Sequence, residues 1–317
     1  MNATTALVFG ILALLLAGPV PALLSRATWP YRTPRAALVL WQAVALAAVL
    51  SAFSSGLAIA ALLLVPGPDG RPTAEPLREI DALGLPLWLT YVAVFTATVL
   101  IGARLIYATL RVAVRTRRRR SRHRMLVDLL DRRESGAAIR QLPHVRILDS
   151  ADPIAYCLPG LRHRVVLSEG TLDHLDDTEL RAVLSHEHSH LRARHDLVLE
   201  AFTAVYEAFP RWVRSGSALG SVQLLIEMLA DDSAVRATGP APLARALVTC
   251  AESRTPTGAM AVGGPSTLLR VQRLAGPGAD TRTAAVAYIA AAAILVVPTV
   301  AVAVPWLVEV DRLLRAW

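Results

Sequence analysis

Four long stretches with very few charged residues dominate this sequence. They cover residues 6–24, 36–65, 86–112 and 284–308. Each is close to the length of about 20 apolar residues that a helix needs to cross a bilayer. The composition agrees, because 54% of the 317 residues are hydrophobic and the mean hydropathy is +0.45, too apolar for an ordinary soluble domain. The sequence therefore predicts a mostly α-helical integral membrane protein with about four transmembrane helices.

Arginines indicate how these stretches are oriented. They follow the first and third stretches, at residues 26–35 and 115–120, whereas acidic residues outnumber basic ones in the loop after the second stretch. Short cytoplasmic loops of membrane proteins retain positive charge. The sequence thus predicts that both termini lie outside the cell and that residues 113–283 lie in the cytoplasm. None of the 33 basic residues is lysine, a bias we expect from a GC-rich bacterial genome, and hence we expect a multi-pass protein of the bacterial plasma membrane.

The net charge of +8 does not by itself indicate a nucleic-acid-binding protein. Much of it lies in the arginine run beside the third apolar stretch, where anionic lipid and topology are the commoner explanation. We therefore expect the lipid bilayer as a partner and no direct contact with nucleic acid. The two cysteines, Cys157 and Cys250, have neither a metal-binding nor a redox spacing, and we interpret both as reduced packing residues. Whether the chain forms a homo-oligomer stays open.

Residues 113–283 contain both strand and helix patterns, and they are numerous enough to bury a core of their own. A short amphipathic helix is predicted at residues 125–133, and strands at 145–150 and 164–168 with a turn between them. A further helix is predicted to begin near Asp176 and to reach about Arg194, because an aspartate followed three residues later by glutamate is a typical helix start. Another helix is predicted at residues 221–238.

The first of these helices contains His186, Glu187 and His190 in an H-E-x-x-H motif. Two histidines four residues apart share one face of a helix, so their imidazoles can bind the same metal ion. Glu187 can accept a proton from an attacking water and return it to the leaving amine. His188 points away from this face and is predicted to be a surface residue. His195 also falls away from this face if the helix continues so far, and we expect a structural or helix-end role for it.

A catalytic zinc site needs a third protein ligand, and Glu227 in the next predicted helix is the candidate. Asp231 lies one turn further along the same face, where it can accept a hydrogen bond from the second nitrogen of a ligating histidine. The predicted site therefore holds one Zn²⁺ per chain through His186, His190 and Glu227. Arg236 and Arg245 follow Glu227, but a surface role is expected for both.

These residues resemble the BlaR/MecR group of bacterial membrane metallopeptidases, and more distantly the HtpX and CAAX-prenyl membrane proteases. All are gluzincins in which H-E-x-x-H is followed by E-x-x-x-D. The resemblance implies that the metal ligands are His186, His190 and Glu227 and that the general base is Glu187. It also implies an α+β gluzincin-type zinc metallopeptidase domain in the cytoplasm. A sheet edge beside the active-site helix holds the substrate in such proteases, and residues 164–168 are the expected counterpart.

The order of the regions also looks like the membrane core of the BlaR/MecR type. Residues 1–112 would form a three-span transmembrane region, 113–283 the peptidase domain, and 284–317 the fourth helix with a short outer tail. Because the chain ends soon after the fourth stretch, we expect it to lack the penicillin-binding sensor domain and not to react covalently with β-lactams. The resemblance implies a zinc endopeptidase that cleaves a cytoplasmic protein in a signalling pathway, with a winged-helix repressor of the BlaI type as the expected substrate.

Three other hypotheses stay open. Within the enzymes, the alternative is a quality-control protease for membrane proteins of the HtpX type. The second is an inactive membrane scaffold that zinc stabilises. Metal binding alone does not require Glu187, so the presence of this carboxylate argues against the scaffold. A transporter or channel is the third. The apolar stretches of this sequence lack the paired acidic and basic residues that mark ion pathways, which argues against it.

Overall fold

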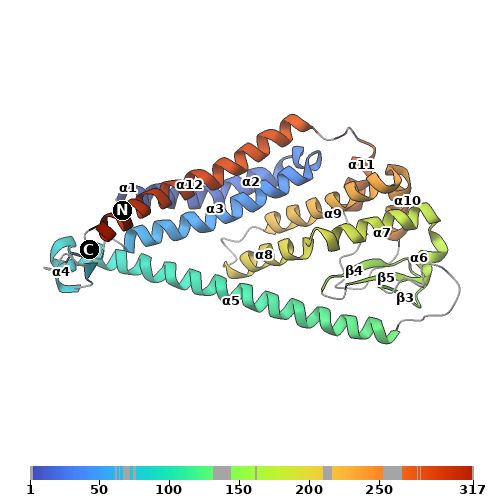
Figure 1. Cartoon of the computed structure of the whole chain (residues 1–317), viewed down its shortest axis with the longest axis horizontal. Helices are drawn as coiled ribbons and strands as arrows, with labels where there is room; N and C mark the ends of the chain where they lie inside the picture. The colour runs from blue at the N-terminus through green and yellow to red at the C-terminus, as the bar shows by residue number, and fades with distance from the viewer. Residues whose placement is uncertain are drawn as a thin grey trace.

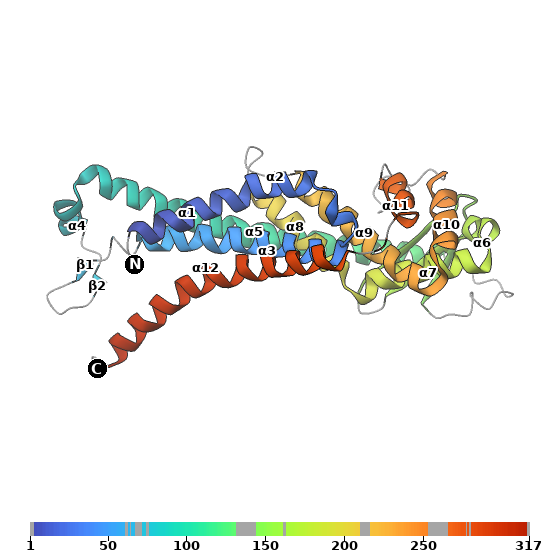
Figure 2. The same cartoon turned by 90° about the horizontal axis from the view of Figure 1, so that it is seen from above.

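The structure is a computed structural model of the chain, and it describes residues 3–60, 63, 65–66, 72–73, 76–130, 144–160, 163–209, 216–252, 266–276, 278 and 280–315. The molecule is elongated and mostly helical. Long helices run side by side along one half of it, and a small sheet lies at the opposite end (Figures 1 and 2). The start of the first helix and the end of the last helix both lie at the end away from the sheet.

Four segments among the described residues are long and apolar enough to cross a membrane. They are the pair α1 (Ala3–Ala17) and α2 (Pro19–Arg26), α3 (Pro34–Ala60), α5 (Leu85–Leu130) and α12 (Thr281–Arg315). Each coincides with one of the four stretches predicted from the sequence. The first segment is divided at Gly18 because Pro19 has no backbone N–H with which to continue the helix. These helices are consistent with a membrane protein.

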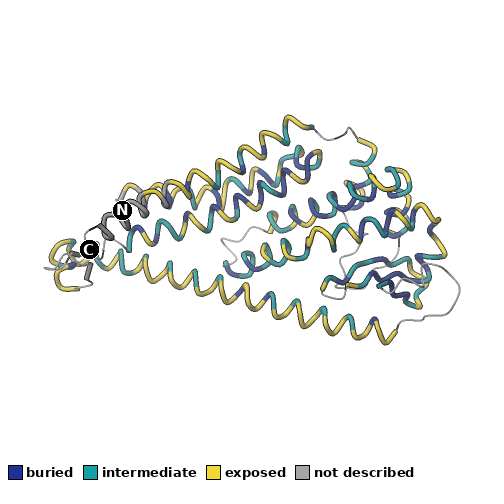
Figure 3. The backbone as a smooth tube through the Cα atoms, in the orientation of Figure 1, coloured by how far each residue is buried: buried dark blue, intermediate teal, exposed yellow. Residues whose placement is uncertain are grey.

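α5 is a single helix of 46 residues. The helical state predicted at residues 125–133 is confirmed for 125–130, but these residues are the last stretch of α5 and do not form a short helix of their own. The physical reason is that no proline or glycine follows Gly102 within α5, and arginine favours the helical conformation. Figure 3 shows that most of the surface of α5 is exposed along its length.

The hydrophobic core crosses the boundary between the apolar helices and the region that follows them. Leu225 and Ile226 of α9 (Gly216–Thr238) pack in one cluster with Trp41 and Val44 of α3. The preceding helix α8 (His195–Ala208) packs against the same cluster through Phe202. α8 and α9 lie between α3 and α5 (Figure 1). The division of the chain at residues 112 and 283 stays a prediction, but one apolar core connects its two sides.

The sheet at the far end has three strands: β3 (Val145–Leu148), β4 (Ala155–Leu158) and β5 (Arg164–Ser168). β5 is the central strand, parallel to β3 and antiparallel to β4. Val165 and Leu167 pack on one face with residues of α7 (Asp177–Arg192), whereas Val166 packs on the other face with Val127 of α5. The sheet therefore separates α7 from the end of α5.

Two predictions about this sheet are wrong. The turn predicted between the two strands contains β4, because a four-residue strand between Pro153 and Pro159 leaves little pattern beyond its turn residues. The strand at residues 164–168 is not a sheet edge, since both of its sides are paired. Among the described strands, β4 is the outer strand that packs beside α7, and its outer edge has no partner strand there.

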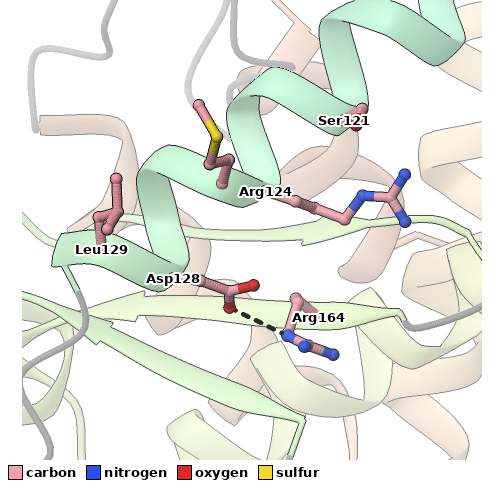
Figure 4. A pocket seen from close by; sticks show the side chains of 6 residues that line it. Ser121, Arg124, Asp128, Leu129 and Arg164 are labelled. Carbon is pink, nitrogen blue, oxygen red and sulfur yellow. Dashed lines mark hydrogen bonds and ion pairs between the residues drawn. The ribbon is translucent and has the colours of Figure 1, made fainter.

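The remaining elements are short helices and one small hairpin. They are η1 (Trp29–Tyr31), β1 (Val65–Pro66), β2 (Pro72–Thr73), α4 (Pro76–Leu83), α6 (Glu169–His174), α10 (Pro240–Glu252) and α11 (Ser266–Leu274). A cavity of about 410 Å³ lies between the end of α5 and β5, where Asp128 and Arg164 form an ion pair (Figure 4). It is lined by Ser121, Arg124, Met125, Asp128, Leu129 and Arg164, so none of the predicted metal-site residues contributes to it.

Candidate active site

α7 carries the histidine pair, and its start follows from its sequence. Asp176 accepts hydrogen bonds from the backbone N–H groups of Thr178 and Glu179, while the Glu179 side chain accepts one from the backbone of Asp176. This capping box stabilises a helix start by about 1 kcal/mol. The helix ends at Arg192, two residues before the predicted end. Within it, the Nε2 atoms of His186 and His190 lie 3.2 Å apart.

Glu227 of α9 lies beside the two histidines and is the third member of the group. Its two carboxylate oxygens lie 3.4 Å from Nε2 of His186 and 3.5 Å from Nε2 of His190. One ligand atom from each of these three residues lies within 4.8 Å of the other two. The structure thus brings together the three residues that the sequence predicts as metal ligands. Their role as ligands stays a prediction.

The spacing of these atoms fits a zinc ion. Zinc bonds to histidine nitrogen and carboxylate oxygen are about 2.0–2.2 Å long, so two ligands at tetrahedral angles lie about 3.3–3.6 Å apart. The two Nε2 atoms are 3.2 Å apart, and they lie 3.4 and 3.5 Å from different oxygens of the Glu227 carboxylate, so the group is close to this spacing. Two imidazoles and one carboxylate are also a ligand set found in catalytic zinc sites, with one position left for water. The residues present therefore fit the metal that the sequence implies.

Asp231 lies behind His186, as the sequence predicts. Its carboxylate is 3.0 Å from Nδ1 of His186 and is fully buried. Arg270 of α11 donates two hydrogen bonds to it, at 2.8 and 2.6 Å, and also lies 3.2 Å from Glu227. Arg270 is 1% exposed, so it is a buried cation that fixes the buried carboxylate of Asp231 and the partly buried one of Glu227.

His195 lies against the histidine pair, and the prediction that it falls away from this face is wrong. The helix ends before it, and His195 begins α8 instead. Its side chain is buried, and its Nδ1 lies 3.1 Å from Nδ1 of His190. Burial lowers the pKa of His195 to about 4, so its imidazole is neutral near pH 7. His188 is exposed, as predicted, with its Nδ1 near the carbonyl of Leu184.

Glu187 is buried between the ligand residues and the sheet. It forms a hydrogen bond with the thiol of Cys157 on β4. Burial raises the pKa of Glu187 above its ordinary value of 4.5, and the negative charge of Glu227 acts in the same direction. Burial also raises the pKa of the Cys157 thiol, so the thiol is the donor. A carboxylate with a raised pKa is suited to accept a proton and later to return it.

The charges of the site balance around His186. Burial acts to lower its pKa, but the carboxylates of Asp231 and Glu227 raise it to about 10. Burial acts to raise the pKa of Glu227, but the neighbouring histidines and Arg270 lower it to about 2. Burial lowers the pKa of His190 to about 4. Without a metal, a proton on His186 therefore provides the positive charge that the carboxylates favour.

The arrangement has the parts that hydrolysis of a peptide bond needs. A zinc ion held by His186, His190 and Glu227 would supply Lewis-acid activation of water and polarisation of the substrate carbonyl. Glu187 stands next to one ligand, where it can take the proton of the attacking water and pass it to the leaving amine. Asp231 and Arg270 hold His186 and Glu227 in place.

Arg270, His195 and Cys157 were not predicted as parts of the site. Arg270 is 39 residues from its partner Asp231, and nothing in the local sequence connects the two. Of the two arginines considered from the sequence, Arg236 is exposed, and Arg245 pairs with Glu179 at the far end of α7, 2.6 Å away. The exposure of Arg236 and the ion pair of Arg245 therefore do not connect either arginine with the metal ligands.

Comparison with known proteins gives a family. Residues 116–277, just over half of the chain, match Peptidase family M48. This segment contains α6 to α11, all three strands of the sheet, the three candidate ligands and Glu187. No curated protein and no solved structure matches the chain. The chain therefore belongs to peptidase family M48, whose members are typically zinc-dependent metallopeptidases.

Proposed function

We propose that this protein is a membrane-embedded zinc endopeptidase that hydrolyses peptide bonds of a cytoplasmic protein. The observation that carries the proposal is the grouping of His186, His190 and Glu227, whose ligand atoms lie within 4.8 Å of one another, close enough to share one zinc ion. Glu187 is buried beside these ligands and has a raised pKa. An inactive zinc scaffold would have no use for such a carboxylate, so this feature supports an active enzyme.

The positions of the arginines are the basis for proposing that the peptidase domain lies on the cytoplasmic side of the membrane. The last part of α5, which follows its apolar stretch, contains seven arginines between residues 115 and 124, and positive charge is retained on the cytoplasmic side. The start of α1, the end of α12 and α4 lie together at the end away from the sheet (Figure 1). Both termini would then lie outside the cell if the sheet lies inside.

The outer edge of β4, which has no partner strand among the described residues, is the proposed position for the substrate. An extended peptide can add to an exposed strand edge through its backbone hydrogen bonds. β4 is beside α7, and Cys157 in this strand contacts Glu187, so a peptide along this edge passes next to the general base. The resemblance to the BlaR/MecR group supports an edge of this kind, although the strand is not the one expected.

The resemblance to the BlaR/MecR group also supports a winged-helix repressor of the BlaI type as the substrate. The core shared by α9 and α3 favours a second candidate, a damaged membrane protein as in the HtpX type. Glu227 directly follows Ile226, which packs against membrane-spanning helix α3. The site thus lies close to the apolar helices. A segment of a membrane protein that lies next to the bilayer could therefore enter it.

The testing experiment measures zinc content and proteolysis of the full chain purified in detergent. We expect about one zinc per chain and cleavage of casein or of a candidate repressor by the wild type. His190→Ala removes one of three ligands, so we expect loss of zinc and of cleavage. His188→Ala is the matched control, because this histidine lies on the same helix and is exposed.

Two results would contradict the proposal. Absence of zinc from the wild type after purification with added metal would rule out the site. Zinc at about one per chain without cleavage of casein, of a repressor or of a membrane protein would favour the scaffold. Comparison of the cleaved substrates then separates a regulatory protease from a quality-control protease.

Zinc binding is expected to release one proton, because the pKa of His186 is raised to about 10 and its nitrogen must be deprotonated to bind metal. Below that pH, protons compete with zinc for His186. The pKa of His190 is about 4, so this second histidine does not compete above about pH 5. The apparent zinc affinity should therefore rise about tenfold per pH unit between about pH 6 and 8. Chelator competition at several pH values measures this slope, and an affinity independent of pH would contradict it.

A further inference from the structure

The two histidine ligands have different partners on their outer nitrogens. Nδ1 of His186 faces the carboxylate of Asp231, whereas Nδ1 of His190 faces Nδ1 of His195 at 3.1 Å. In His190, Nε2 faces the other two ligands, so Nδ1 must hold the ring hydrogen when the imidazole is neutral. Such a hydrogen needs an acceptor, because a buried N–H without one is costly. Nδ1 of His195 is the atom placed to accept it, and it does so when it carries no hydrogen of its own.

The backbone before His195 is bent to bring it there. Arg194 has φ 49° and ψ 43°, and it is the one non-glycine residue with positive φ in the described part of the chain. The left-handed conformation costs an L-residue about 1–2 kcal/mol. The bend between α7 and α8 returns His195 to the last turn of α7, where the imidazole is 5% exposed. Strain of this kind persists where the surrounding structure holds it in place.

The first turn of α8 is in turn fastened to α5. Arg120 of α5 lies 3.0 Å from Asp196 and 2.8 Å from Glu200. All three side chains are mostly buried, which strengthens the attraction between them relative to an exposed pair. Asp196 directly follows His195 in the sequence. The position of His195 is therefore held from both sides, by the bend at Arg194 and by Arg120.

We propose that His195 is the positioning residue for the metal ligand His190: its Nδ1 accepts the Nδ1 hydrogen of His190 and so keeps Nε2 of His190 directed at the metal. Partners of this kind set the tautomer and the ring orientation of a ligand, and their loss weakens metal binding. The proposal rests on the proposed function, because it takes His186, His190 and Glu227 as the ligands. It differs from a packing role, in which any side chain of suitable size would serve.

The test compares two substitutions of equal size in the full chain, His195→Asn and His195→Leu. Asparagine keeps an acceptor oxygen close to the position of Nδ1, whereas leucine has none. We expect zinc affinity, measured by chelator competition, to fall about 10–100-fold in His195→Leu. His195→Asn should stay close to the wild type. His188→Leu is the matched control, since it replaces an exposed histidine of α7, and its affinity should be unchanged.

Two further readouts separate positioning from packing. The visible spectrum of the cobalt-substituted protein reports the geometry of the ligands, and it should change in His195→Leu and be restored in His195→Asn. Nitrogen NMR of the wild type, zinc-loaded and labelled in histidine, needs no variant, and it should show His195 protonated on Nε2 alone.

Equal affinities and spectra for the asparagine and leucine variants would overturn the proposal, and so would a proton on Nδ1 of His195. If a variant does not fold, the NMR result on the wild type decides. Failure of the wild type to bind zinc at all would instead contradict the proposed function, so the two failures are distinguishable.

Discussion

Replacement of Glu187 by glutamine is expected to lower kcat/KM for casein by about 10²–10⁴-fold while about one zinc per chain remains bound. Glutamine has nearly the same size and fits the same buried position, but its amide cannot accept the proton of the attacking water. The ligands His186, His190 and Glu227 are untouched by this change. Zinc content by elemental analysis, measured on the same samples as proteolysis, checks both halves of the expectation.

The matched control for this variant is Glu207→Gln. Glu207 lies on the neighbouring helix α8 and pairs with Arg115 at the surface, so its carboxylate is not part of the site. Its loss should leave cleavage near the wild-type rate, because surface ion pairs contribute little. Cleavage at the wild-type rate by the Glu187→Gln variant would show that another group acts as the base.

Arg270→Leu should give the largest loss of stability. Arg270 is buried against Asp231 and Glu227, and leucine would leave the buried carboxylate of Asp231 and the partly buried one of Glu227 without their cation. Removal of one partner from a buried ion pair costs about 3–5 kcal/mol. We therefore expect a clear fall in the thermal unfolding temperature of the metal-free protein in detergent. The zinc-loaded protein should lose less, because the metal offsets part of the negative charge.

The sign of the pH dependence follows from Asp231. Burial acts to raise its pKa, but contacts with Arg270 and His186 hold the pKa well below its usual range. The stability from this pair is thus present above the ordinary value of 3.8 and is lost as the pH falls through the lower folded value. The control Arg236→Leu replaces an exposed arginine and should change stability by less than about 0.5 kcal/mol. An Arg270→Leu variant as stable as this control would contradict the role of Arg270 in fixing the carboxylates of Asp231 and Glu227.

The parts of the molecule that follow from short-range patterns were predictable. The four apolar stretches are long enough to be recognised by length, and the capping box at Asp176 is a local signal. His186 and His190 share a helical face by their spacing alone. Glu227 required one more step, the need of zinc for a third ligand, and the structure places it beside the pair.

The parts that depend on tertiary packing were not predictable. The position of His195 requires a left-handed residue at Arg194, and arginine rarely adopts that conformation. Arg270 reaches Asp231 only because α11 folds back against α9. β4 has four residues between turn signals, too few for a pattern of alternation, so the order of the sheet could not be derived. The sequence therefore indicated the ligands but not the residues that support them.

The unbroken length of α5 has a mechanical consequence. At 1.5 Å per residue, its 46 residues make a rod of about 70 Å, more than twice the thickness of the hydrocarbon core. A rod without a joint cannot tilt at one end alone. If α5 crosses a bilayer, a change in its crossing angle displaces its far end sideways, and with it the strand residues Arg146 and Arg164 that are bound to Asp128.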